Sequence, residues 1–395
     1  MLLGLLLARA GVDVTVLEKH GDFLRDFRGD TVHPSTLEVM HELGLLDALL
    51  ARPHDRAYEI GVTVGEQRVA IADFRRLKTR CGFIAMMPQW EFLDFLRAHA
   101  STYPGFDLMM NTEATGLTQA GGRVTGVVAR TPQGELRVEA DLVVCADGRR
   151  SVLREAAGLS VRDLGAPIDV LWLRIGKRPG DPPGSAGILG AGRFVAMIDR
   201  GGYWQCAYVI HKGGIGAIQS RGLDAFRAEV SALVPLFAGR LEQELTSWDA
   251  VKLLSVSVDR LERWWKPGLL CIGDAAHAMS PIGGVGINLA VQDAVASANL
   301  LWRKLADGSA SADALTPLLQ QVQQRRMWPT WLIQGMQVMV QNKLIGPLLG
   351  STRPVSMPLV LQLLDRFPAL RAIPASVIGV GVRPEQVRSP REVRR

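Results

Sequence analysis

The stretch PGLLCIGDAAHAMSPIGGVGINLAVQDAVASANLL, residues 267–301, decides how this sequence folds. Its apolar run from Gly268 to Gly273 predicts a buried strand that ends at the carboxylate of Asp274. A glycine-rich loop follows, and beyond Gly284 the pattern predicts a long helix to about Ala306. Ligands of open α/β sheets bind at the carboxyl ends of the strands. The stretch therefore predicts a ligand site at Asp274.

The glycines of this loop suit a flat ligand. Gly283, Gly284 and Gly286 allow the backbone to approach closely and leave several N–H groups directed at the ligand. The helix start near Ile287-Asn288 adds a partial positive charge, which suits a ligand that becomes anionic on reduction. The alternative is a loop that only turns the chain, but a carboxylate directly at the strand end favours a binding site.

The first residues, MLLGLLLARAG, predict a buried helix over Leu2–Ala10 that Gly11 ends. Residues Val12–Leu17 alternate and predict a strand, with Glu18 at its end. This order is that of the second half of a βαβ nucleotide-binding unit, in which the final acidic residue binds a ribose. We therefore expect the natural chain to begin upstream of Met1, with a strand and a G-x-G-x-x-G loop, and expect residues 1–395 alone to purify poorly soluble or colourless.

The remaining pattern predicts an α/β protein: a discontinuous Rossmann-like domain with an inserted β-rich domain and a C-terminal helical segment. Helices are expected over 36–50, 88–100 and 223–237, and two strands around the turn at Gly201-Gly202. The end of the chain is expected to be helical up to Pro354 and irregular beyond it. The predicted segments are 1–60, 87–163 and 256–308 for the nucleotide domain, 61–86 and 164–255 for the substrate domain, and 309–395 for the C-terminal region.

Composition excludes several classes of protein. The 395 residues are 48% hydrophobic and 21% charged, as in ordinary globular proteins. Half of the net charge of +6 comes from the tail after residue 382, so a nucleic-acid surface is not expected. The four cysteines are scattered and have no CxxC spacing, so the sequence shows neither a common zinc-binding pattern nor a disulfide framework. This use of cysteine fits a reducing cytoplasm. No apolar run reaches the length of a membrane span, and the opening lacks the basic start of a signal peptide.

Several motifs resemble one family. GDAAHAMSPIGGVGINLAVQDA is similar to the FAD-ribityl motif of flavoprotein monooxygenases of the p-hydroxybenzoate hydroxylase type. DLVVCADGRRSVLREAAGL, residues 141–159, resembles their second fingerprint, in which Asp-Gly contacts both flavin and pyridine nucleotide. FRGDTVHPSTLEVMHELGL, residues 27–45, and PQWEFLDFL, beginning at Pro88, resemble two further family segments. The matches follow the family's order up to about residue 305, whereas its first Gly-rich fingerprint is absent.

The resemblance implies a set of FAD contacts. Glu18 would bind the adenosine ribose, Arg28 would lie beside the flavin or pyrophosphate, and Gln89 would contact the ribityl chain or ring edge. Asp147 and Gly148 would sit between FAD and the nicotinamide nucleotide, and Asp274 would hold a ribityl hydroxyl. Pro281, Gly283, Gly284, Gly286, Ile287 and Asn288 would follow the flavin ring. No metal is expected, because His277 has no partner at ligand spacing, and His33 is expected to be structural.

The implied activity is hydroxylation of an aromatic or phenol-like small molecule with NAD(P)H and O₂, through a flavin hydroperoxide. The flavin carries this chemistry, so no catalytic side chain is predicted. Strand alternation over 203–211 places Tyr203, Gln205 and His211 on one face and Trp204, Cys206 and Tyr208 on the other, and either face could meet the substrate. One alternative is another FAD-dependent oxidoreductase, although the W-x-W-x-I-P stretch of the halogenases is absent. The other is a truncated, non-catalytic protein that binds no FAD. The C-terminal helices could form the interface of a homodimer or a lid over the site.

Overall fold

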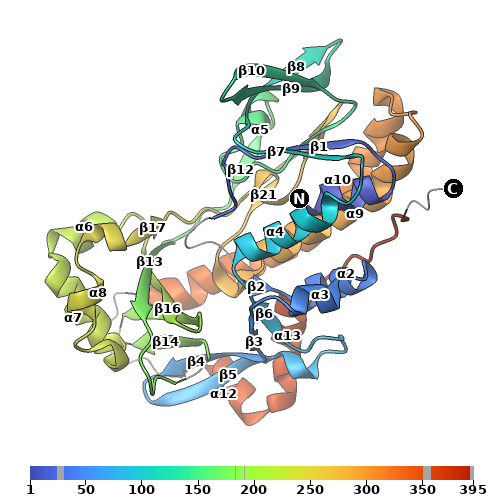
Figure 1. Ribbon diagram of the computed structural model, residues 1–395. Coiled ribbons are helices and arrows are strands. Elements are labelled where there is room, and N and C mark those ends of the chain that lie inside the picture. Colours follow the sequence, from blue (N-terminus) through green and yellow to red (C-terminus); the bar gives the residue numbers. More distant parts are fainter. Residues whose placement is uncertain (25–30, 183, 191, 350–356, 392–395) are drawn as a thin grey trace.

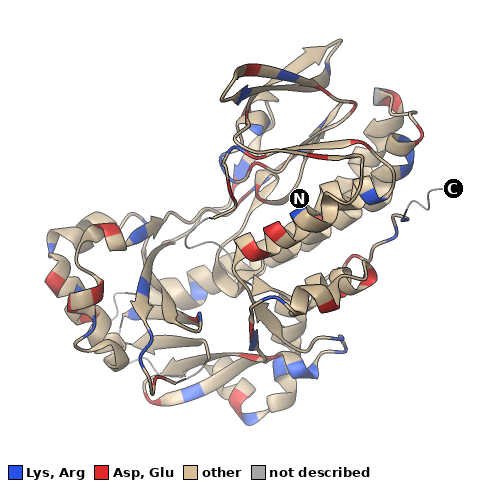
Figure 2. Cartoon of the chain, viewed as in Figure 1, with Lys and Arg blue, Asp and Glu red and all other residues tan. Residues whose placement is uncertain are grey.

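The computed structural model describes residues 1–24, 31–182, 184–190, 192–349 and 357–391. Figure 1 shows two lobes, joined through the long helices α9 (Gly286–Ala306) and α10 (Ala312–Val340), which lie side by side. The upper lobe carries strands that the sequence assigns to the nucleotide domain, and the lower one is built around a seven-stranded sheet. Acidic and basic residues are interspersed over most elements (Figure 2), in keeping with the modest net charge.

Parallel strand pairs form the centre of the upper lobe, as the sequence predicts. Here β1 (Val14–Leu17) pairs with β7 (Phe106–Met109), and β11 (Val143–Cys145) pairs with β20 (Leu269–Cys271), which also pairs with β19 (Trp265–Lys266). Helix α1 (Leu2–Arg9) is buried and packs against α4 (Gln89–Ala100) and α9. A Cβ on Gly4 of α1 would lie 2.9 Å from the Phe106 ring, so a larger residue would push the helix off the strands.

Small sheets and short helices surround this centre. Strands β9 and β10 form a hairpin, and β8 pairs with β9 on its other side. The pairings are β10 (Gly134–Glu139)–β9 (Arg123–Thr131)–β8 (Glu113–Ala120), β12 (Val161–Asp163)–β18 (Asp259–Leu261)–β21 (His277–Ala278), and β2 (Thr31–Val32)–β6 (Ile84–Met86)–β3 (Asp55–Ala57). The prediction of one helix over 36–50 is wrong, because Gly44 adopts a φ of +72° and separates α2 (Pro34–Glu42) from α3 (Leu46–Leu50).

The seven-stranded sheet forms the lower lobe. Its order is β17 (Lys252–Leu254), β13 (Ile168–Gly176), β16 (Tyr203–His211), β15 (Arg193–Asp199), β14 (Ala186–Gly190), β4 (Glu59–Val64) and β5 (Gln67–Asp73). One face packs against α6 (Ile215–Ser220), α7 (Leu223–Leu233) and α8 (Leu241–Glu244). The helix predicted over 223–237 stops earlier because Pro235 begins a short 3-10 turn. Of the segment 61–86 that is expected in the substrate domain, β4 and β5 join this sheet, whereas β6 pairs with β2 and β3. The division into domains stays a prediction.

The C-terminal region is helical well beyond α10. A π-helical segment covers Gln341–Ile345, and α11 (Gly346–Leu348) follows it. The prediction of irregular chain after Pro354 is wrong, because α12 (Leu359–Arg366) and α13 (Ala372–Gly379) form there. Pro358 is the N-cap of α12 and Pro368 begins a 3-10 turn before α13, positions where a missing N–H costs little. None of the described helices is both long and apolar enough to cross a membrane.

Candidate flavin-binding site

The glycine-rich loop has the geometry expected of a close ligand approach. Gly283 and Gly284 both adopt left-handed backbone conformations, with φ of +79° and +64°. A Cβ on Gly284 would also lie 3.0 Å from the Thr31 hydroxyl. Helix α9 starts at Gly286 without a side-chain cap, so its first N–H groups remain available as donors. A flat, electron-rich group fits this combination of small residues and backbone donors.

The structure brings the two strand-end motifs together. Because β11 and β20 pair in parallel with Cys145 opposite Cys271, the segments after them share one sheet edge. Arg149, directly after Asp147-Gly148, places its Nε 3.1 Å from an Asp274 carboxylate oxygen. Its Nη2 donates to the carbonyl of Met279 at 2.9 Å. Sequence reasoning missed Arg149, since nothing local connects it to a carboxylate 125 residues away.

The ion pair leaves Asp274 open to a ligand. The Asp274 side chain keeps 37% of its surface exposed, and that of Arg149 keeps 28%. A ribityl hydroxyl could therefore reach the carboxylate without displacing buried structure. FAD fits these donors and acceptors: a strand-end carboxylate, glycines at positive φ and an uncapped helix start.

Asn288 is held by neighbouring helices instead of pointing freely into the site. Its buried Oδ1 accepts from the hydroxyl of Ser35 at 2.5 Å and from that of Thr36 at 3.4 Å. Both hydroxyls belong to the first turn of α2. Asn288 therefore fixes α9 against α2, and a direct cofactor contact by its side chain remains a prediction.

The other expected residues lie on separate elements. Glu18 follows β1, where its N–H donates to the carbonyl of Met109 at 2.9 Å and its carboxylate accepts from the N–H of His20 at 3.0 Å. Gln89 begins α4, directly after Pro88. Arg28 lies outside the described residues. The FAD roles of all these residues stay predictions.

His33 joins the loop to the C-terminal region. Its Nδ1 lies 2.8 Å from the carbonyl of Ile378 and its Nε2 lies 3.0 Å from the carbonyl of Gly284. Burial lowers the pKa of His33 to about 4, although both carbonyl contacts oppose that shift. The ring is therefore neutral at physiological pH, and its contacts are those of a structural residue.

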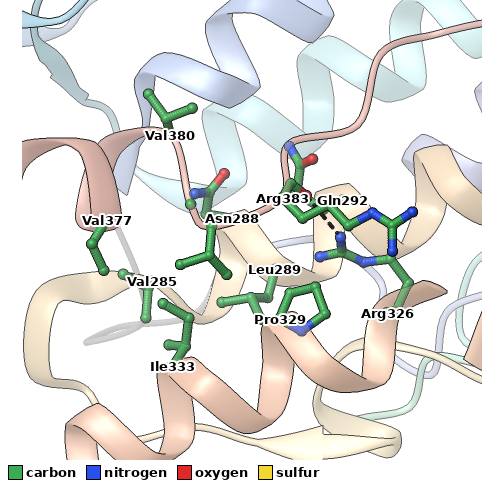
Figure 3. Close-up of a pocket in the computed structure, with 12 residues that line it drawn as sticks. Val285, Asn288, Leu289, Gln292, Arg326, Pro329, Ile333, Val377, Val380 and Arg383 are labelled. Atoms are coloured by element: carbon green, nitrogen blue, oxygen red, sulfur yellow. Dashed lines mark hydrogen bonds between the residues drawn. The ribbon is translucent and has the colours of Figure 1, made fainter. Parts of the chain in front are cut away.

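His277 belongs to a buried charged cluster behind the strand-end turn. Its Nε2 lies 2.6 Å from Asp293, which also accepts from the N–H of Gly273 at 3.0 Å and from Arg326 Nε at 2.9 Å. Figure 3 shows Arg326 beside a cavity between α9, α10 and the C-terminal segment. That cavity measures only about 10 Å³, which is room for one water and far too little for a flavin.

Comparison with known proteins gives the class. A family model described as FAD binding domain matches residues 1–326. A 6-methylpretetramide 4-monooxygenase from Streptomyces rimosus is 32% identical over 377 residues, which cover 94% of this chain and 87% of that protein. A rifampicin monooxygenase from Rhodococcus hoagii is 27% identical, over 75% of this chain and 60% of its own length.

Solved structures agree on the fold. An anhydrotetracycline hydroxylase from Streptomyces rimosus has a TM-score of 0.71 at 22% identity, covering 96% of this chain and 73% of that one. The p-nitrophenol 4-monooxygenase of Pseudomonas putida also has a TM-score of 0.71, at 19% identity, covering 95% and 92%. A myxobacterial halogenase has a TM-score of 0.69, so this fold alone does not select a reaction.

The chain belongs to the FAD-binding domain family. It is an FAD-dependent monooxygenase of the aromatic hydroxylase class, which uses NAD(P)H and O₂. The expectations of an α/β fold, of the cofactor and of the class of reaction are confirmed.

Proposed function

We propose that this monooxygenase hydroxylates a large, flat aromatic molecule with several fused rings. The observation that carries the proposal is the sheet face opposite the glycine-rich loop. Trp172, Phe194 and Ala207 of this face share one apolar cluster with Ile282 of the loop. The aromatic and small residues form a wide apolar wall, which suits a flat ring system.

The other face of the sheet is closed to substrate. Trp204, Cys206 and Tyr208 are buried in the core formed with α7. Strand alternation alone does not decide which face meets the substrate. This packing supports the face that carries Gln205 as the substrate face. Tyr203, at one end of that face, has its ring 4.0 Å below the guanidinium of Arg174, and His211, at the other end, has its Nε2 3.2 Å from the carbonyl of Leu349.

Trp172 offers a specific polar contact. Its indole N–H is buried and has no hydrogen-bond partner in the described part of the chain. A buried donor without a partner is costly, and a substrate oxygen would satisfy it. We propose that Trp172 donates to a keto or phenol oxygen of the substrate. The relative from Streptomyces rimosus is described as a 6-methylpretetramide 4-monooxygenase, and we take this as support for the same substrate class.

Cofactor binding is proposed at the expected residues. Asp274 and Glu18 would accept from hydroxyls of FAD, while Gly283, Gly284, Gly286 and Ile287 would present backbone to its ring. When bound, FAD supplies the redox chemistry and activates O₂. The protein contributes position, N–H donors and a cover that excludes water.

A separate cavity supports a place for the nicotinamide nucleotide. It measures about 460 Å³, lies next to Gly148, and is lined by Arg149, Arg150 and Arg154. Arg150 is exposed and forms no hydrogen bond or ion pair with the described residues. Guanidinium groups suit phosphate, so we propose that this cavity receives phosphates of NAD(P)H as it visits Asp147-Gly148.

The deciding experiment gives the full natural protein NAD(P)H, ¹⁸O₂ and a panel of phenols and fused-ring aromatics. The proposal expects bound flavin absorbance, slow flavin reduction alone, much faster reduction with a fused-ring compound, and one ¹⁸O atom in the product. A protein that binds FAD and oxidises without oxygen transfer would be another FAD-dependent oxidoreductase. A protein that binds no FAD would be a non-catalytic remnant.

We also propose a reducing compartment such as the cytoplasm. All four cysteines are free and buried, and Cys145 and Cys271 remain thiols although they face each other on adjacent strands. A homodimer is proposed through α12, where Leu359 is 82% exposed and Val360 and Leu363 lie beside it. Light scattering at several concentrations tests the dimer.

A further inference from the structure

Helix α10 and the first residue of the π-helical segment that continues it carry three buried glutamines on one face. Gln334 and Gln341 are fully buried and Gln337 is 5% exposed. Their spacing of three and four residues aligns them along the helix. The FAD-binding family model ends at residue 326, so this glutamine ladder (Gln334, Gln337 and Gln341) lies beyond the part of the chain that it matches.

Gln337 bonds the backbone on both sides of Pro281. Its Nε2 donates to the carbonyls of Ser280 at 3.0 Å and Ile282 at 2.9 Å. Its Oε1 accepts from the N–H of Ser280 at 3.2 Å. One side chain therefore fixes the backbone positions of three consecutive residues that lead into the glycine-rich loop.

The other two glutamines extend this attachment. Gln334 donates from Nε2 to the carbonyl of Ala278 at 3.0 Å and to that of Asp259 at 2.7 Å. Gln341 donates to the hydroxyl of Ser280. Residues 278–282 are thus held along their length by side chains of α10 and of the π-helical segment after it.

The segment needs these donors for a physical reason. Strand β21 ends at Ala278, and Pro281 has no N–H, so regular strand pairing does not satisfy the following carbonyls. A buried carbonyl without a donor is costly, and a primary amide supplies both donors and an acceptor. An apolar residue at position 337 would fill the space but leave three backbone groups without partners.

We propose that the glutamine ladder consists of positioning residues, which set the place of Pro281 and Ile282 against the flavin ring and the substrate. Ile282 also packs with Trp172 and Phe194 of the sheet face. The ladder therefore links α10 to both the cofactor side and the substrate side of the reaction. This inference rests on the proposed function and deepens it.

The test replaces Gln337 by methionine, which has similar length and no comparable hydrogen bonds. The matched control is Gln324→Met, the same change at an exposed position of the same helix. Three quantities are compared: the melting temperature, the visible circular dichroism of bound FAD, and the fraction of NAD(P)H consumed that yields oxygenated product instead of hydrogen peroxide.

The proposal expects Gln337→Met to bind FAD with an altered visible dichroism and to lose about tenfold in product per NAD(P)H, because small displacements at a reacting centre have large effects. Gln324→Met should match the unmodified protein. A Gln337→Met protein that melts earlier but keeps both the dichroism and the product yield overturns the proposal, because the ladder would then be merely structural.

A milder pair of variants keeps the test decisive if Gln337→Met does not fold. Gln341→Met removes the bond to the Ser280 hydroxyl, and Ser280→Ala removes that bond together with the one that the same hydroxyl accepts from the N–H of Ile282 at 3.3 Å. Both should shift the dichroism and the yield in the same direction, and the double variant should add little to Ser280→Ala. Unchanged values in both single variants overturn the proposal. Absence of any oxygenated product from the unmodified protein overturns the proposed function itself, which separates the two failures.

Discussion

Two charged clusters lie on either side of the turn that follows β20, and they differ in burial. The buried cluster (His277, Asp293 and Arg326) is at most 2% exposed at each side chain. The strand-end pair (Arg149 and Asp274) keeps 28% and 37% of its side-chain surface exposed. A buried charge depends on its partners, whereas a half-exposed pair can rearrange around a ligand. We therefore assign the first to stability and the second to the cofactor.

The largest expected effect comes from the buried cluster. Asp293→Ala should lower the free energy of unfolding by about 3–5 kcal/mol, because it removes the nearer carboxylate of buried Arg326, leaving only Glu385 at 3.5 Å, and also the partner of His277 and of the Gly273 N–H. Urea unfolding measures this loss. Asp224→Asn, which removes a 95% exposed carboxylate paired with Arg227, is the control and should cost less than about 1 kcal/mol. Equal losses in the two variants would remove the distinction between buried and exposed pairs.

The strand-end pair should respond in cofactor affinity. Asp274→Ala should weaken FAD binding by about 1.5–3 kcal/mol, a roughly tenfold to hundredfold rise in Kd, while leaving the fold intact. FAD titration of the full natural protein measures it, with Asp107→Ala on the exposed edge of β7 as the control. An unchanged Kd would exclude Asp274 from the site.

Arg149→Gln should have a smaller effect than Asp274→Ala. It removes a half-exposed ion pair and the bond to Met279, but leaves the carboxylate for the ligand. We expect a stability change within about 1 kcal/mol and less than a tenfold change in FAD affinity. A loss as large as that of Asp293→Ala would show that this pair is structural after all.

The smallest expected effect is the response of the buried cluster to mild acid. Burial alone would raise the pKa of Asp293, but its contacts with His277 and Arg326 outweigh burial and lower the pKa below 3.8. A lowered carboxyl pKa contributes stability that is complete above the unfolded value and is lost as pH falls through the folded value. The stability advantage of wild type over Asp293→Asn should therefore not decrease as the pH falls from 7 to about 5. A difference that already falls between pH 7 and 5 would contradict this assignment.

The sequence predicted those parts of the fold that depend on neighbouring residues. The glycine-rich loop, the start of α9 and the parallel strands could be located because strand periodicity, helix length and glycine conformation are local properties. Errors arose where a single residue interrupts a pattern. Gly44 divides one expected helix into two, and Pro358 caps α12 in a part of the chain that was expected to be irregular.

The sequence by itself determined the family, the cofactor and the strand end at which Asp274 lies, because these follow from short motifs with a physical role. Only the tertiary structure decided which residues meet there. Arg149 reaches Asp274 across 125 residues, and Gln337 reaches Ser280 across 57. It also decided which sheet face α7 covers, because alternation fixes that two faces exist but only packing selects the one buried against α7. Contacts of this range depend on strand order and helix packing, which no local pattern encodes.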